Sequence, residues 1–307
     1  WSEGKFAEPV RVEIDNVCFD DYDLILSVGQ IVPHEVAGMA NYTKNVCVGV
    51  GGPDIINKSH FLGAVYGMER IMGRTGTPVR QLYNYAVGTY LKTLPIQYIF
   101  TVVAPEEDGA GMAVKGLFAG DDAETFQRAA RLSQQVNMSF VDEPLENVVV
   151  YLAPEEFKST WLGNKAIYRT RMAMADGGEL RVLAPGLERF GEDEQVDGLI
   201  RKYGYRGTEQ TLAAVHNDPS LRENLSAAAH LIHGSSEERF TIRYCPGPRV
   251  TREEIESVGY QWGDVDAALK RYDPAHLRDG WNTLPDGEAV YFVRNPALGL
   301  WALRSRF

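Results

Sequence analysis

Strand-length apolar runs alternating with helical segments are the feature of this sequence that most restricts its fold. Residues 24–28 and 148–152 are almost entirely apolar over the length of one strand. Such runs are typical of parallel strands that are covered on both faces. Segments with helical spacing separate the runs along the whole chain. The alternation predicts an α/β fold with two α/β domains and mostly parallel sheets.

The expected elements set the domain limits. We expect strands at 10–14, 24–28, 96–103, 112–118, 147–152, 179–183, 240–244 and 288–293, and helices at 54–68, 78–92, 121–136, 161–175, 192–203, 208–216, 220–233 and 262–272. The composition changes at 137–144, which predicts a first domain at 1–139 and a second at 140–276. The segment 277–307, with the final strand, is expected to return to the first domain. A cofactor cleft is expected between the two domains.

Composition excludes several classes of protein. No apolar run approaches the roughly 18 residues of a membrane span. The formal net charge is −11 and lysine and arginine do not cluster, so neither a nucleic-acid nor a membrane partner is expected. The chain has three cysteines, a small and odd number that argues against a disulfide framework. With no apolar leader at the start, the sequence predicts a cytoplasmic protein.

One segment carries residues suited to chemistry. His34 and His60, two of only six histidines, flank Lys44 in a stretch rich in glycine. Histidine accepts protons near neutral pH and binds transition metals. A lysine in a loop can bind phosphate or join covalently to a cofactor. From the spacing alone, a turn with a surface lysine and capping histidines is the stronger interpretation.

The same segment resembles the signature of the nickel-pincer-nucleotide lactate racemase family. That signature is Pro-His-x-x-Ala-Gly-Phe-Ser-Gly-Gly-x-Lys, followed by Pro-Gly-Val-x-Gly and by an isoleucine and a histidine. Here it is matched by Pro33-His34 through Ala37-Gly38 to Lys44, then by Gly49 and His60, with the same spacing of histidine, lysine and histidine. Residues 117–121 and 161–165 also resemble segments of the family.

The resemblance implies roles for particular residues. Lys44 would carry the cofactor, nickel pyridinium-3,5-bisthiocarboxylate mononucleotide, and His60 would bind its nickel. His34 would be the catalytic acid/base residue, and Gly38 and Gly49 would let the backbone approach the cofactor. The implied activity is inversion of the Cα of a 2-hydroxy acid by proton-coupled hydride transfer. Enzymes that synthesise the cofactor would be partners.

A second segment would contact the substrate. Lys165 matches a lysine that would neutralise the substrate carboxylate, and Trp161 matches an aromatic residue of the family. Leu162 stands where the family has glutamine, which predicts a different substrate preference. A solvated helix lysine is the alternative interpretation of Lys165.

The sequence also departs from the signature. Asn41-Tyr42-Thr43 takes the place of Ser-Gly-Gly, bringing Cβ atoms where glycines allow close approach, and Val48 replaces a proline. The family has a preceding α/β stretch with a second catalytic histidine, whereas no histidine precedes His34. We therefore expect that the first domain lacks its N-terminal part, and that residues 1–307 alone are inactive.

Two other functions remain open. The first is a cofactor-free, catalytically inactive binding protein of the same fold. The second is a simple metal-dependent enzyme that uses His230 and His233, which lie three residues apart and so share one helix face. Cys47, close to Lys44, is expected to be a small buried hydrophobic residue and not a nucleophile.

Overall fold

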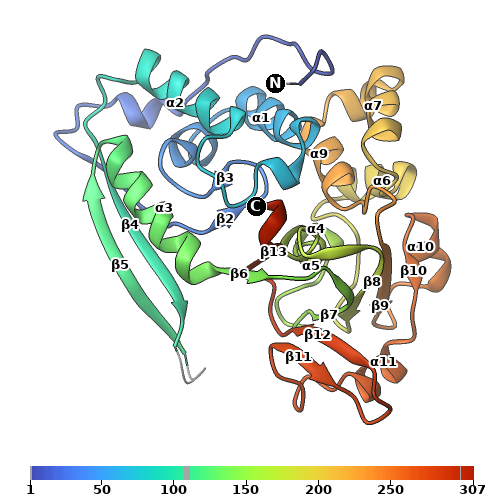
Figure 1. The fold of residues 1–307 in the computed structure, drawn as a ribbon. Coiled ribbons are helices and arrows are strands. Elements are labelled where there is room, and N and C mark those ends of the chain that lie inside the picture. The colour runs from blue at the N-terminus through green and yellow to red at the C-terminus, as the bar shows by residue number, and fades with distance from the viewer. Residues whose placement is uncertain (1, 107–110, 298) are drawn as a thin grey trace. The chain divides into compact units, whose positions relative to one another are not determined.

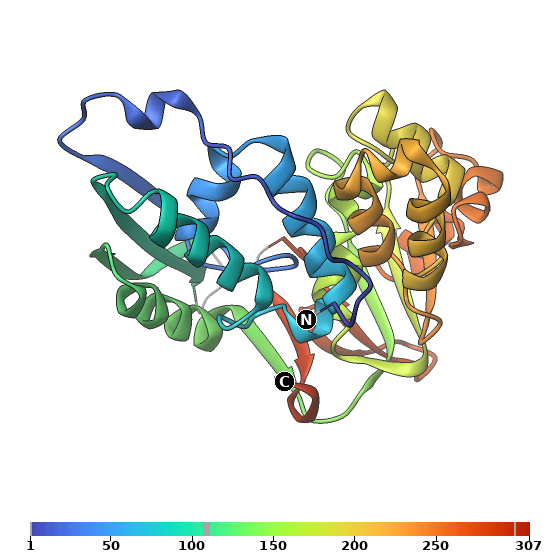
Figure 2. The same ribbon diagram turned by 90° about the horizontal axis from the view of Figure 1, so that it is seen from above.

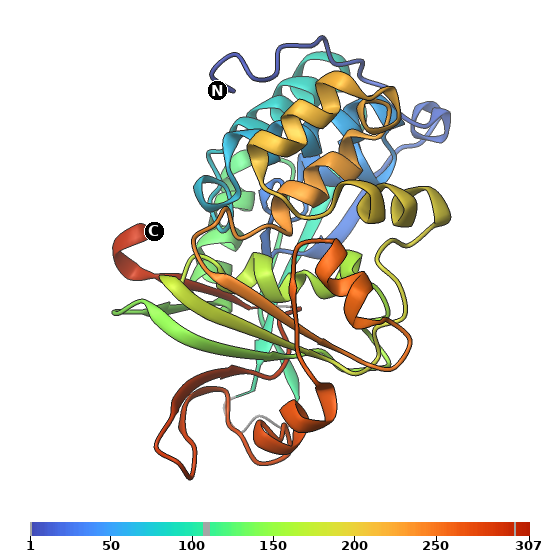
Figure 3. The same ribbon diagram turned by 90° about the vertical axis from the view of Figure 1, so that its right-hand side faces the viewer.

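The chain folds into two compact units, Trp1–Met138 and Ser139–Phe307 (Figure 1; turned views in Figure 2 and Figure 3). The structure is a computed structural model that describes residues 2–106, 111–297 and 299–307. Part of the turn expected between the strands at 96–103 and 112–118 lies outside the described residues. Both units combine helices with parallel strands, so the predicted α/β class is confirmed.

The first unit is built on a three-stranded sheet in the order β1 (Ile25–Gln30), β4 (Ile96–Pro105) and β5 (Met112–Gly120). The β1 and β4 strands are parallel, and β4 and β5 are antiparallel. Helix α3 (Ala123–Asn137) packs against β4 and β5. Its Phe126 joins Tyr98, Phe100 and Val102 in a buried cluster. Alternation along β4 therefore directs one set of side chains to this core.

Two helices cover the remainder of this unit. Helix α1 (Pro53–Tyr66) begins with a proline at its first turn and ends at Gly67, whose φ of 108° suits glycine. Helix α2 (Pro78–Tyr90) is capped by Thr77, which accepts a hydrogen bond from the backbone N–H of Arg80. The helices pack together around Ile55, Cys47 and Tyr83 among other buried residues. Short elements join them to the sheet: η1 (Asn16–Phe19), β2 (Pro33–His34), β3 (Gly38–Met39), η2 (Asn45–Gly49) and η3 (Met68–Arg70).

Two expectations for this unit are wrong. Residues 10–14 form no strand, and only Ile14 makes an isolated bridge, to Gly51. The run at 24–28 does form a strand, but β1 is at the sheet edge and its Leu26 and Val28 are 54% and 60% exposed. The reason is that side chains on one face of β1 point away from the core, and no described helix of this unit covers that face. Leu117 on β5 is 67% exposed on the same face.

The second unit contains a six-stranded sheet with both faces occupied. Its order is β10 (Gln261–Trp262), β9 (Thr241–Pro246), β8 (Met174–Ala184), β7 (Leu145–Tyr151), β12 (Ala289–Val293) and β11 (Gly280–Thr283). Neighbouring strands are parallel except β12 and β11. Val149 and Leu183 pack with Tyr272 on one face, whereas Tyr244 contacts Asn164 on the other. The 148–152 run is thus covered on both sides, as predicted.

Helices surround this sheet, and a small second sheet joins β6 (Met138–Val141) to β13 (Leu300–Leu303). The helices are α4 (Thr160–Gly163), α5 (Lys165–Thr170), α6 (Glu194–Tyr203), α7 (Thr208–Asn217), α8 (Pro219–Arg222), α9 (Leu225–His233), α10 (Arg252–Ser257) and α11 (Val265–Arg271), and the chain ends in η4 (Arg304–Arg306). The single helix expected at 161–175 is broken at Asn164, and the one at 220–233 at Asn224, which caps α9. No described helix is long and apolar enough to span a bilayer.

The prediction that the final strand returns to the first unit is wrong. Strand β12 pairs in parallel with β7, with Tyr291 opposite Val148, and residues 277–307 belong to the second unit. Val290 and Phe292 are completely buried in the cluster that contains Val149. The apolar strand needed a covered sheet partner, and β7 supplies it within the unit where the strand lies.

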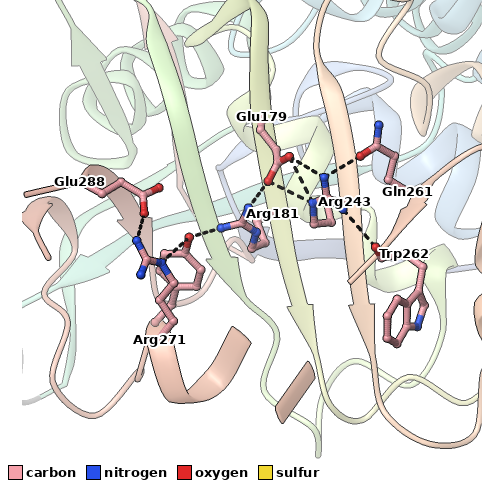
Figure 4. Close-up of polar contacts among 8 residues, drawn as sticks. Glu179, Arg181, Arg243, Gln261, Trp262, Arg271 and Glu288 are labelled. Atoms are coloured by element: carbon pink, nitrogen blue, oxygen red, sulfur yellow. Dashed lines mark hydrogen bonds and ion pairs between the residues drawn. The ribbon is translucent and has the colours of Figure 1, made fainter. Parts of the chain in front are cut away.

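A polar network links the strands of this sheet to α11 (Figure 4). Glu179 on β8 forms ion pairs with Arg181 and with Arg243 of β9, and Arg243 also donates to the backbone of Trp262. Arg181 continues the network by donating to the hydroxyl of Tyr272. These groups lie on one face because residues two apart on a strand point the same way.

Candidate functional site

The signature residues all lie in the first unit, on short elements between β1 and α1. His34 ends β2, which pairs with Gly38 of β3 in a small hairpin. Lys44 immediately precedes the η2 turn, and His60 lies in the second half of α1. His34 and Lys44 are therefore positioned by glycines and short hydrogen-bonded turns, and not by long regular elements.

One ring nitrogen of His60 is held by its own helix. Its Nδ1 lies 2.7 Å from the carbonyl oxygen of Ile56, and because a carbonyl only accepts, Nδ1 carries the proton. Nε2 therefore keeps its lone pair, and no described residue forms a hydrogen bond with it. Burial lowers the pKa of His60, and the charge of Lys44 acts in the same direction. In metal-binding histidines, the ring nitrogen that does not bind the metal commonly donates its hydrogen to such a carbonyl.

Lys44 is the second reactive group at this place. Its side chain is half-buried, and none of the described residues forms a hydrogen bond or ion pair with its amine. Burial lowers the pKa of Lys44, the charge of Arg80 lowers it further, and Glu35 opposes both. A larger share of the amine is therefore unprotonated, which favours covalent attachment.

Glu35 belongs to the same cluster, although the sequence pattern did not single it out. Its carboxylate raises the pKa of both Lys44 and His60, and Lys44 lowers that of His60. The three side chains are thus close enough to influence one another's charge. A variable position between two signature residues gave no sequence signal for Glu35.

His34 lies next to Glu35 and is held by the backbone. Its Nδ1 accepts hydrogen bonds from the N–H groups of Val36 at 3.1 Å and Ala37 at 3.3 Å. Nδ1 therefore holds a lone pair, and the neutral ring carries its proton on Nε2. In this arrangement His34 presents a hydrogen-bond donor from Nε2.

The two signature glycines differ in their surroundings. Gly38 has a φ of 82°, and a Cβ there would lie 2.0 Å from the carbonyl oxygen of Arg74. The chain's own packing therefore requires glycine at this position. Gly49 is exposed, and a Cβ there would meet no atom within 4 Å. Contact of either glycine with a cofactor stays a prediction.

The residues before Lys44 keep the conformation that glycines favour. Counted back from Lys44, the two glycines of the signature correspond to positions 41 and 42 rather than 42 and 43. Asn41 and Tyr42 have φ values of 67° and 59°, in the left-handed region. The Tyr42 ring stacks on Phe126 with centroids 5.0 Å apart, and Thr43 is buried. The side chains of Tyr42 and Thr43 therefore pack in the core of this unit.

One buried residue supports this loop and was missed by the sequence reasoning. Arg80 of α2 donates through Nη1 to the carbonyl oxygen of Asn41 at 3.0 Å and to Oγ1 of Thr43 at 3.1 Å, and through Nη2 to the carbonyl oxygen of Met39 at 2.5 Å. Burial lowers the pKa of Arg80 to about 10. Its position inside an amphipathic helix gave no hint that the side chain is buried.

Cys47 is inert in this setting. It is completely buried between α1 and α2, and burial raises the pKa of its thiol to about 12. The predicted role as a small buried hydrophobic residue is confirmed.

Lys165 lies in the second unit, where it begins α5 and is half-buried. The preceding segment is firmly held: Asn164 donates to the hydroxyl of Tyr260 at 2.9 Å and accepts from that of Tyr244 at 3.3 Å. The ring of Trp161 lies 4.3 Å from that of His230. The family-like segment is thus anchored by a buried polar network, and the role of Lys165 stays a prediction.

The geometry does not favour a metal site at His230 and His233. The Nδ1 of His230 is 2.6 Å from the hydroxyl of Tyr168, and its Nε2 is 3.0 Å from that of Tyr205. Both nitrogens are therefore engaged. Across the described residues, no group of three or more His, Cys, Asp or Glu side chains is arranged to hold a metal ion.

A pocket of about 550 Å³ lies in the second unit, away from the signature residues. It is lined by Gly207, Thr208 and Glu237 among others, at the start of α7. The Glu237 carboxylate already accepts from the backbone N–H and hydroxyl of Thr208. This site is internally satisfied and acidic, so it does not suit a carboxylate substrate.

Comparison with known proteins shows the fold. No protein-family model matches the sequence, and no curated protein matches it significantly. A Thermotoga maritima protein of known crystal structure is similar, with a TM-score of 0.80 and 23% identity over 99% of this chain and 72% of that one. The lactate racemase apoprotein from Thermoanaerobacterium thermosaccharolyticum has a TM-score of 0.66 and 14% identity over 94% of this chain.

The chain thus has a lactate racemase-like α/β fold. It spans 65% of the length of the lactate racemase apoprotein.

Proposed function

We propose that this chain is a lactate racemase-like isomerase that inverts the Cα of a 2-hydroxy acid. It would use a nickel pincer nucleotide attached to Lys44, with His60 as the nickel ligand. The observation that carries the proposal is that Lys44, whose pKa is lowered, and Nε2 of His60 both lack a hydrogen-bond partner among the described residues and influence one another's charge. The lactate racemase-like fold supports it.

The residues present fit such a cofactor. A single imidazole does not hold a metal ion by itself, and the described residues offer no three-ligand cluster. The pincer nucleotide brings its own sulfur and carbon ligands, so one histidine is what it needs from the protein. Imidazole is a ligand that suits nickel, so His60 would complete the metal's ligand set. The side chains of Tyr42 and Thr43 pack in the core of this unit.

Each residue then has a separate task. When bound, the cofactor supplies the acceptor and donor for the substrate hydride. Lys44 anchors it, and His60 holds the metal through Nε2. His34 would face the substrate hydroxyl with Nε2, which in the neutral ring donates a hydrogen bond to the substrate oxygen while two backbone N–H groups fix the ring. Accepting the hydroxyl proton at Nε2 would require the tautomer that carries its proton on Nδ1. Lys165 is proposed to bind the substrate carboxylate.

Loading of the cofactor tests the attachment. The protein is produced together with the cofactor-synthesis enzymes, and its intact mass and nickel content are measured. We expect added mass on the peptide that contains Lys44, and none in Lys44→Ala. Lys92→Ala, an exposed lysine of the same unit, should load normally. A wild-type chain without added mass or nickel would overturn the proposal and favour the cofactor-free binding protein.

Catalysis is tested on loaded protein. In a longer chain that supplies the second catalytic histidine, His34→Ala should keep the adduct and the nickel but invert D- or L-lactate, or another 2-hydroxy acid accepted by that chain, about 10²–10⁴-fold more slowly. Unchanged inversion would remove His34 from the proposed mechanism and leave the attachment at Lys44 untouched.

A further inference from the structure

A buried guanidinium without a carboxylate partner lies beneath the loop that carries Lys44. Arg80 is only 2% exposed, and no described residue forms an ion pair with it. Arginine is rarely buried this completely unless it is paired, because desolvating the charge is costly. A methionine or leucine would fill the same space in α2 without that cost. The charge therefore needs a reason beyond packing.

The terminal nitrogens of Arg80 donate to residues before Lys44, whereas its buried Nε has no hydrogen-bond partner among the described residues. They reach the carbonyl oxygens of Met39 and Asn41 and the hydroxyl of Thr43, while the guanidinium lies 4.6 Å from the centroid of the Phe126 ring. Thr43 also donates to Asn84 of α2 at 2.7 Å. One rigid fork thus fixes three alternate positions of the same loop.

This loop needs external support. Asn41 and Tyr42 are consecutive non-glycine residues in the left-handed region, a conformation that is unfavourable for a residue with a Cβ atom such as Tyr42. Asn41 is 2% exposed and Thr43 is 3% exposed, so water cannot replace the missing bonds at little cost. Lys44 follows directly, and its backbone direction is set by this turn.

We propose that Arg80 is a positioning residue, which holds residues 39–43 in the turn that presents Lys44. The inference rests on the proposed attachment at Lys44 for its functional meaning. Its structural content does not, because it concerns only the order of the loop. If Arg80 served only the general packing of the unit, its loss would speed amide exchange across the whole unit and not mainly in this loop.

Hydrogen exchange of the protein without cofactor separates the two roles. In Arg80→Met, which keeps most of the volume, we expect backbone amides of residues 40–46 to exchange roughly tenfold faster or more, because charge-assisted bonds are lost. The amides of α1 and β4 should keep their protection. Arg80→Lys, which retains the charge but not the fork, should lie between Arg80→Met and the wild type. Arg128→Met, an exposed arginine of α3 over the Phe118 ring, is the matched control and should change nothing.

Equal acceleration across α1, α2 and β4, or none at 40–46, would overturn the proposal. If Arg80→Met does not fold, Thr43→Val decides when it is compared with Asn84→Ala. Thr43→Val removes one acceptor of Arg80 together with the bond to Asn84, and Asn84→Ala removes only the latter, so Thr43→Val should accelerate the same amides more than Asn84→Ala does. On protein made with the cofactor-synthesis enzymes, Arg80→Met should also lower the fraction of Lys44 that carries added mass. A wild-type chain that never loads refutes the proposed function, while the exchange result still decides the role of Arg80.

Discussion

Two histidines on helices of this protein have opposite surroundings. His60 of α1 uses Nδ1 to donate to a carbonyl of its own helix and leaves Nε2 unengaged. His230 of α9 has a tyrosine hydroxyl on each nitrogen and the Trp161 ring against its face. Among the described residues, neither histidine belongs to a group of three or more side chains that could hold a metal ion. The difference is whether the fold has already used the lone pair that a ligand would need.

The comparison teaches how a functional polar group differs from a structural one. A saturated buried network rigidifies its region, and losing one member leaves the others unpaired. A polar group that uses only one of its hydrogen-bonding atoms is held in one orientation, and its other atom can still bind a ligand. His60, beside the unpartnered Lys44, belongs to the second kind. His230 belongs to the first, although its spacing from His233 made it a metal-site candidate in the sequence.

Removing His60 should have the largest effect. His60→Ala is expected to reduce nickel bound by the loaded protein to background, because the protein's metal ligand is gone. Its stability should fall by only about 1 kcal/mol, the value of one hydrogen bond. Nickel analysis and urea unfolding measure the two quantities. Exposed His276→Ala is the control, and nickel retained by His60→Ala would erase the distinction between the two histidines.

Removing His230 should produce the converse pattern. His230→Ala is expected to lower the free energy of unfolding by about 2–4 kcal/mol, since two buried hydroxyls lose a partner and a cavity forms beside Trp161. Nickel binding at His60 should persist. Urea titration followed by tryptophan fluorescence gives the free energy. A loss below the error of that measurement would mean that the network is not structural.

A subtler change sharpens the same point. Tyr205→Phe removes the hydroxyl that contacts both His230 and Thr160, and should lower stability by about 1 kcal/mol. Tyr203→Phe is the matched control, because the contacts of its hydroxyl, with Ser220 at 3.5 Å and with Asp218 and Lys202, lie at the exposed surface. Equal losses in the two variants would show that burial of the network carries no energetic weight.

The smallest expected effect concerns acid. Burial raises the pKa of Glu179, but hydrogen bonds and charges from Arg243 and Arg181 outweigh it, so the folded pKa lies below its usual range. This contribution to stability is present above the unfolded pKa, near 4.5, and is lost as pH falls toward the folded value. Glu179→Gln should flatten the loss of stability below about pH 4.5. Unfolding midpoints at several pH values test this, and an unchanged slope would contradict it.

Much of the fold follows from local patterns. The apolar runs at 96–103 and 147–152, and the proline-initiated helices at 54–68 and 78–92, correspond to β4, β7, α1 and α2. The helix expected at 161–175 failed at Asn164, where side-chain bonds to two tyrosines fix a break. Those tyrosines lie about 80 or more positions away along the chain, so the local sequence pattern could not predict these bonds.

The sequence by itself determined the α/β class and the signature with the spacing of His34, Lys44 and His60, whereas the left-handed turn at Asn41 and Tyr42 came from the structure. Only the tertiary structure decided that β12 belongs to the second unit and that Arg80 is buried under the loop before Lys44. It also decided that both ring nitrogens of His230 have hydrogen-bond partners. The physical reason is that spacing along the chain sets which face a side chain occupies. Whether its polar atoms find partners depends on groups brought together from distant positions.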